Sequence, residues 1–79
     1  MNKIIFKEAN EFKVIYRYYP NGGELFGEVE YIFDLKEAKI LKKSNDDETG
    51  HFGRKAASKI QNVIIEEDAM PRSFTQAWY

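Results

Sequence analysis

The chain has 79 residues, and its 12 basic and 13 acidic side chains give a formal net charge of −1. This length predicts one small domain spanning residues 1–79, because independently folding domains usually have roughly 50–200 residues. The absence of cysteine excludes disulfides, thiol catalysis and cysteine-based metal sites. A net charge near zero also argues against non-specific binding to nucleic acids or to acidic membrane surfaces.

Apolar residues account for 43% of the chain and charged residues for 32%, which is the balance of a globular protein. The longest apolar runs have three residues, as at 4–6 and 63–65, so the sequence predicts no membrane span and no membrane partner. The start of the chain lacks the long apolar stretch of a signal peptide. Because a secreted domain of this size would commonly need disulfides, we expect a cytoplasmic location.

The first half of the chain predicts strands. Residues 1–7 form a short apolar segment, plausible as a first strand, and a turn is expected at 8–11. Residues 12–19 are rich in β-branched and aromatic side chains, which suit a pleated surface. The following Pro-Asn-Gly-Gly, residues 20–23, ends that strand, and residues 25–35 resume the alternation. Residues 12–35 therefore predict a β-hairpin.

The register of this hairpin follows from its apolar pattern, because a slip of one residue moves every side chain to the other face. Pairing Val14 with Tyr31 and Tyr16 with Val29 sets Arg17 opposite Glu28, an attractive pair of charges. The same register places Phe12 and Phe33 on the buried face. A two-residue Asn21-Gly22 turn would shift the pairing by two and require a backbone amide that Pro20 lacks, so a longer loop is favoured.

The next segment leaves two interpretations open. Residues 36–38 predict a turn and residues 39–43 a short strand. A helix over residues 35–43 competes with that strand, since Lys, Glu, Ala and Leu all favour helix. Residues 44–50 form a polar loop.

From Phe52 onward the apolar positions follow the spacing of one helical face, through Ala56, Ile60 and Ile64. Asp47 or Thr49 is expected to cap this helix, which should end before Pro71. Residues 72–79 alternate again and predict an edge strand. The predicted fold is therefore α+β: a three- to four-stranded antiparallel sheet, with hairpin 12–35 at its centre and one C-terminal amphipathic helix on one face.

Candidates for catalysis are few. His51 is the single histidine, and the acidic residues 46–48 lie just before it, but the spacing matches no calcium loop or histidine helix motif. Glu28 and Glu30 share one strand face, yet a flat sheet surface offers little of the depth that shifts a carboxyl pKa. We therefore expect no catalytic residues, no metal site and no cofactor, and predict that the protein is not an enzyme.

The segment 50–59 suggests an anion site. Glycines before a helix free its amides to meet an anion, and cations in the first turn oppose the helix dipole and so invite a functional reason. The predicted contacts to phosphate or nucleic acid are Gly50, His51, Gly53, Arg54, Lys55 and Lys59. The alternative is that the helix begins earlier. Arg54 and Lys55 would then lie in its middle, where the helix dipole does not disfavour them.

The sheet suggests a protein interface, because one helix can cover only one of its faces. If the core side of the hairpin faces the helix, apolar residues gather on the other side, where we expect the first strand to add Ile4 and Phe6. Either the C-terminal segment or another chain must then cover the patch. The candidate interface residues are Ile15, Tyr19, Phe26, Ile32, Trp78 and Tyr79.

These observations favour a small intracellular, non-catalytic protein-binding module that uses this sheet face to bind a partner or a second copy of itself. An inhibitor, antitoxin or immunity-type protein would have this size and kind of surface. The alternative is a small nucleic-acid- or phosphate-binding domain that uses residues 50–59. Nucleic acid is less favoured than protein as the partner.

Overall fold

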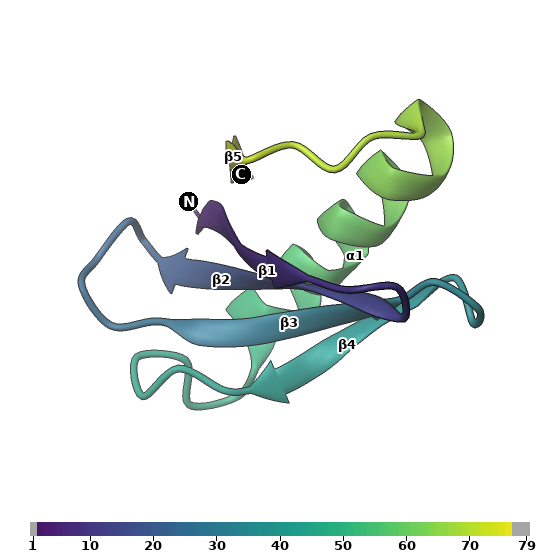
Figure 1. Ribbon diagram of the computed structural model, residues 1–79. Helices are drawn as coiled ribbons and strands as arrows, with labels where there is room; N and C mark the ends of the chain where they lie inside the picture. The colour runs from purple at the N-terminus through teal and green to yellow at the C-terminus, as the bar shows by residue number, and fades with distance from the viewer. Residues whose placement is uncertain (1, 77–79) are drawn as a thin grey trace.

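The computed structural model describes residues 2–76, with side chains described through Ser73. These residues form one antiparallel sheet and one helix (Figure 1). The sheet order is β4-β3-β2-β1-β5, and α1 lies across one face, mainly against β4 and β3. This arrangement confirms the predicted α+β class. The elements are β1 (Asn2–Ala9), β2 (Lys13–Pro20), β3 (Gly27–Ile32), β4 (Glu37–Lys42), α1 (His51–Glu67) and β5 (Ser73–Gln76).

The central hairpin of β2 and β3 has the predicted register. Val14 pairs with Tyr31, Tyr16 with Val29, and Arg17 with Glu28. The connecting loop is the longer one, and it begins with Asn21 and Gly22 at φ values of 55° and 71°. The alternative two-residue turn is therefore wrong, in agreement with the missing amide of Pro20.

Residues 37–42 form a strand, so the competing helical prediction for residues 35–43 is wrong. The strand begins after a tight turn in which Lys36 adopts a φ of 54°. Its lysines then meet acidic partners on β3, with Lys39 opposite Glu30 and Lys42 opposite Glu28. These cross-strand pairs and the burial against α1 outweigh the helical propensity of the isolated segment.

The helix α1 buries the predicted apolar side. Ala56, Ile60 and Val63 pack against the sheet, and Ile60 has 1% of its surface exposed. The helix ends at Asp68, which adopts a φ of 50°, before Pro71 as predicted. The chain then returns as β5, which pairs with β1 and confirms the predicted edge strand over residues 73–76.

Strand β1 corrects one prediction about the faces of the sheet. Ile4 and Phe6 lie on the helix side, where Ile4 is fully buried, and not on the opposite side. The cause is a β-bulge at Lys7: Ala9 pairs with Val14, but beyond the bulge Phe6 pairs with Tyr16. Without the inserted residue, Phe6 would meet the next residue of β2 and face away from α1.

Phe12 corrects a second prediction, because it is 65% exposed and not part of the core. It precedes β2 in a turn organised by Asn10, whose side-chain oxygen accepts hydrogen bonds from the amides of Phe12 (2.8 Å) and Lys13 (3.0 Å). The alternation that defines the buried face therefore begins at Val14, two residues later than the sequence pattern indicates.

Candidate functional site

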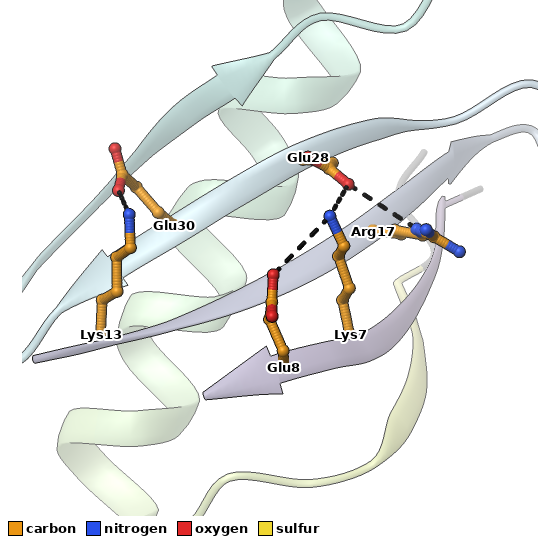
Figure 2. A network of polar contacts seen from close by, with 6 residues as sticks. All are labelled: Lys7, Glu8, Lys13, Arg17, Glu28 and Glu30. Carbon is orange, nitrogen blue, oxygen red and sulfur yellow. Dashed lines mark hydrogen bonds and ion pairs between the residues drawn. The ribbon is translucent and has the colours of Figure 1, made fainter. Parts of the chain in front are cut away.

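The face of the sheet turned away from α1 carries most of the predicted interface residues. We call it the open face, since no helix or strand lies over it within residues 2–76 (Figure 1). Its side chains come from alternate positions of β1, β2 and β3, with the bulge directing Lys7 onto it (Figure 2). The open face comprises Lys3, Ile5, Lys7, Glu8, Lys13, Ile15, Arg17, Tyr19, Glu28, Glu30 and Ile32, and at its β4 side Lys39 and Lys42 lie beside Glu30 and Glu28.

Charged side chains cross the middle of the open face and pair with one another. Lys7 Nζ donates a hydrogen bond to Glu28 Oε2 at 2.9 Å and lies 3.8 Å from Glu8 Oε1, while Arg17 Nε lies 3.7 Å from Glu28 Oε2 (Figure 2). The hydrogen bond from Lys7 lowers the pKa of Glu28, helped by the charges of Lys7, Arg17 and Lys42 against the opposing effect of burial. Glu28 is therefore held as a carboxylate between two cations.

A second ion pair lies further along the same strands. Lys13 Nζ donates to Glu30 Oε1 at 3.3 Å, and Glu30 is only 8% exposed. Ile15, whose cross-strand neighbours are Glu8 and Glu30, is 7% exposed. The aliphatic stems of these long side chains cover the isoleucine, as such stems commonly do on apolar surfaces. Ile15 thus lies on the predicted face but is not displayed there.

The aromatic predictions fall at one corner of the open face. The rings of Tyr19 and Phe26 are 5.6 Å apart, and both side chains are half-buried. The guanidinium of Arg17 lies 4.4 Å from the centre of the Phe26 ring, and Lys42 Nζ lies 5.7 Å from it. Cations at these distances are attracted to the ring face. We call Tyr19, Phe26, Arg17 and Lys42 the aromatic corner.

Of the three remaining predicted interface residues, only Ile32 belongs to the part of the chain that the structure describes. Ile32 pairs with Lys13 and is a diagonal neighbour of Ile15, so the two isoleucines share the open face as expected. Trp78 and Tyr79 lie outside the described residues, and their predicted role stays a prediction.

The N-terminus of α1 holds a buried carboxylate. Asp47, 2% exposed, accepts hydrogen bonds from the amides of Phe52 (3.0 Å) and Gly53 (2.8 Å) and from the hydroxyl of Tyr18 (3.0 Å). The Tyr18 oxygen in turn accepts from the amide of Ser44 at 3.0 Å. Burial raises the pKa of Tyr18 to about 12, although the Ser44 amide favours the ionised form. The N-cap position itself is Gly50, and the first helix amides are instead bonded by the two predicted residues that precede it: Asp47 accepts from two of them, and Thr49 Oγ1 accepts from the His51 amide at 3.4 Å. The bonds of Asp47 connect the loop to both helix and sheet.

This arrangement leaves the predicted anion site without free donors at its centre. Asp47 already supplies a negative charge to the two helix amides that would meet a phosphate. Gly53 is explained by packing, because a Cβ there would come within 2.7 Å of Ile40 Cδ1. The Arg54 guanidinium donates to the carbonyl of Thr49 at 2.9 Å. His51, Lys55 and Lys59 are exposed, and Gly50 adopts a φ of 77°.

The acidic loop before α1 forms an open depression of about 480 Å³ lined by residues 45–49, His51 and Phe52. Across the described part of the chain, no three His, Asp or Glu side chains are grouped so that they could hold a metal ion. Asp47 contributes to this lining but is only 2% exposed, and its carboxylate is already bonded by three donors. We interpret the Tyr18–Asp47 pair as a structural connection.

Comparisons with protein-family models, with curated proteins and with solved structures found no match to this chain. Over residues 2–76, no helix has the length and apolar character that crossing a membrane requires. Functional interpretation therefore depends on the surface itself. The sequence places Tyr19, Phe26 and Ile32 on this face but gives no sign of Lys7, whose position depends on the bulge, or of Lys42, whose segment is compatible with both strand and helix.

Proposed function

We propose that this protein is a small intracellular, non-catalytic protein-binding module that docks its partner on the open face, centred on the aromatic corner. The single observation that carries this proposal is the corner itself, where two half-buried aromatic rings and two cations lie together on a sheet face with no covering layer within residues 2–76. Tyrosine and arginine are among the residues that most often dominate binding energy at protein interfaces.

The charged side chains in the middle of the open face border the aromatic corner on one side. Glu28 and Glu30 are already paired with Lys7 and Lys13, so a partner would have to compete with existing ion pairs to bind them. By contrast, Phe26 can bury more of its ring without losing a hydrogen bond. Protein–protein interfaces commonly combine buried aromatic and arginine side chains with polar residues that stay closer to solvent. Such a protein acts by occupying a surface of its partner, as inhibitors, antitoxins and immunity proteins do.

Site-specific photocrosslinking in cells tests the proposal. A photoreactive phenylalanine analogue would replace Phe26 in one variant and Phe12 in a matched control. Both positions are aromatic and lie near the hairpin, but Phe12 belongs to the turn before β2. We expect one discrete adduct from position 26, abolished by Arg17→Ala, and none from position 12.

The outcomes separate the possible partners. Mass spectrometry identifies the adduct, and an adduct between two copies of this chain would make the function self-association through the open face. Equal labelling from positions 12 and 26 would contradict the proposal, as would an adduct that survives Arg17→Ala. Circular dichroism of each variant confirms that a lost adduct does not reflect unfolding.

A further inference from the structure

A different surface lies along strand β4, which ends the sheet on one side (Figure 1). Within residues 2–76 no strand pairs with its outer edge. The amide of Ala38 points outward, because it donates to the side-chain oxygen of Gln61 on α1 at 2.9 Å. In an antiparallel ladder every second residue directs its backbone groups to the same side, so Ile40 also presents its amide and carbonyl outward.

A groove runs between this edge and α1. Its volume is about 430 Å³, and its apolar surface comes from Ala38, Ile40 and Ala57. The α1 side chains on its rim follow one another at helical spacing and therefore lie in a row. The groove, here called the β4 groove, is lined by Ala38, Lys39, Ile40, Arg54, Ala57, Ser58 and Gln61.

The charged side chains that line the β4 groove are all positive. Lys39 and Arg54 are its charged lining residues, and no acidic side chain lines it. The inner edge of β4 indicates which strand suits this charge: there β3 places Glu30 opposite Lys39 and Glu28 opposite Lys42. A second copy of β4 would instead bring further lysines to a cationic edge, which disfavours pairing of this strand with itself.

We propose that the β4 groove binds an extended acidic segment of another protein, which adds to the sheet as a strand along the outer edge of β4. The backbone of the segment bonds to Ala38 and Ile40, with its own carbonyl replacing the Gln61 oxygen on the Ala38 amide. Alternate apolar side chains enter the groove between β4 and α1. The acidic ones point to the other side of the sheet, where Lys39 lies opposite Glu30, while Arg54 on α1 adds positive charge on the groove side. This is recognition by strand addition, with affinity from the backbone and specificity from alternate side chains. It uses residues distinct from the aromatic corner and stands or fails independently of it.

The probe is a synthetic peptide, acetyl-Glu-Val-Glu-Val-Glu-Val-amide, titrated into the isotope-labelled full chain and followed by NMR. We expect the largest shifts at the amides of Ala38 and Ile40 and at the side-chain amide of Gln61. The same peptide methylated on alternate backbone nitrogens keeps its charge but cannot form the ladder, so its affinity should fall at least about tenfold.

Charge reversal tests the recognition from the side of the protein. Lys39→Glu combined with Arg54→Glu should weaken binding about tenfold or more, whereas Lys59→Glu, an exposed position of α1 outside the groove, should change it less than twofold. The fingerprint spectrum of each variant confirms folding before titration. A Lys-Val peptide of the same length should not bind.

Several results would overturn the proposal. If the methylated peptide bound as tightly as the unmethylated one, charge attraction alone would explain the binding, and no strand would be added to the sheet. Displacement of the peptide by a single-stranded oligonucleotide, or shifts confined to other surfaces, would assign the cations to another ligand. Dimers that form through β4 without peptide, detected by sedimentation, would make the edge a self-association site. No shift at millimolar peptide would exclude recognition of an acidic strand.

Discussion

The two faces of the sheet are built from the same strands but exclude water in different ways. On the face against α1, side chains such as Val14, Tyr16 and Val29 are fully buried because a helix lies over them. On the open face, Ile15 and Glu30 are nearly as buried, although only their neighbours' side chains cover them. Low exposure in so thin a domain therefore does not identify the packed core. The packed core is identified by what covers the side chains: a helix on one face, and only neighbouring side chains on the other.

The carboxylates on the two sides of the sheet also differ in what surrounds them. Asp47, beside the covered face, is 2% exposed and is bonded by two backbone amides and a hydroxyl. Glu28, on the open face, is paired with the side chains of Lys7 and Arg17, which are about one-third exposed to solvent. Losing an acceptor in a buried network leaves donors without partners, whereas ion pairs near solvent are replaced by water. The covered side should therefore dominate stability.

The largest expected effect tests that contrast at Asp47. Asp47→Ala removes the acceptor of three donors, on Tyr18, Phe52 and Gly53, and should lower the free energy of unfolding by about 3–5 kcal/mol. Urea denaturation followed by circular dichroism measures the loss. Asp46→Ala is the matched control, since that neighbouring side chain is exposed, and it should cost under about 0.5 kcal/mol. Equal losses in the two variants would refute a structural role for the buried carboxylate.

The next largest effect compares adjacent residues of β1. Ile4 is fully buried under α1, whereas Ile5 faces the open side and is half-buried. Ile4→Ala should cost about 2–5 kcal/mol, and Ile5→Ala about 1 kcal/mol, because only the first leaves a cavity inside packed atoms. The two denaturation midpoints provide the test. If Ile5→Ala proved as costly as Ile4→Ala, then either the open face is packed as tightly as the core or the bulge at Lys7 is misplaced.

The hairpin, the helix and the antiparallel sheet could be predicted because each depends on local patterns that agree with one another. Val14, Tyr16, Val29 and Tyr31 alternate on either side of a turn signal, and the missing amide of Pro20 decides between the two registers that keep these residues on one face. The helix follows from apolar spacing alone. Such features need no knowledge of distant contacts.

The faces of β1 and the site at the helix start could not be predicted in the same way. A bulge of one residue at Lys7 reverses the side on which Ile4 lies, and nothing in the composition marks it. Similarly, a glycine in the first turn of a helix is compatible with both anion binding and close packing. Contact of Gly53 with Ile40, a residue of another element, decides between them, so the answer lies in the tertiary structure.

The smallest expected effect concerns Glu28 and acid. Its pKa in the folded protein is lowered from the ordinary value of 4.5, chiefly by the hydrogen bond from Lys7, so folding favours its ionised form. The resulting stabilisation is fully present above the pKa of the unfolded chain and is lost as the pH falls through the folded pKa. Because the pair is partly solvated, Glu28→Gln should cost only about 0.5–1 kcal/mol at pH 7.

The difference between wild type and Glu28→Gln should therefore shrink as the pH is lowered from about 5, and also in high salt, which screens pairs near solvent. Urea titrations at a series of pH values measure it, with Glu48→Gln as a control at an exposed position. A difference of several kcal/mol, or one that persists unchanged in acid, would show that Glu28 acts as a buried network member. The open face would then resemble the covered one, and a partner would find it too rigid to rearrange. A small, pH-dependent difference instead means that the ion pairs can open at little cost, as docking beside the aromatic corner requires.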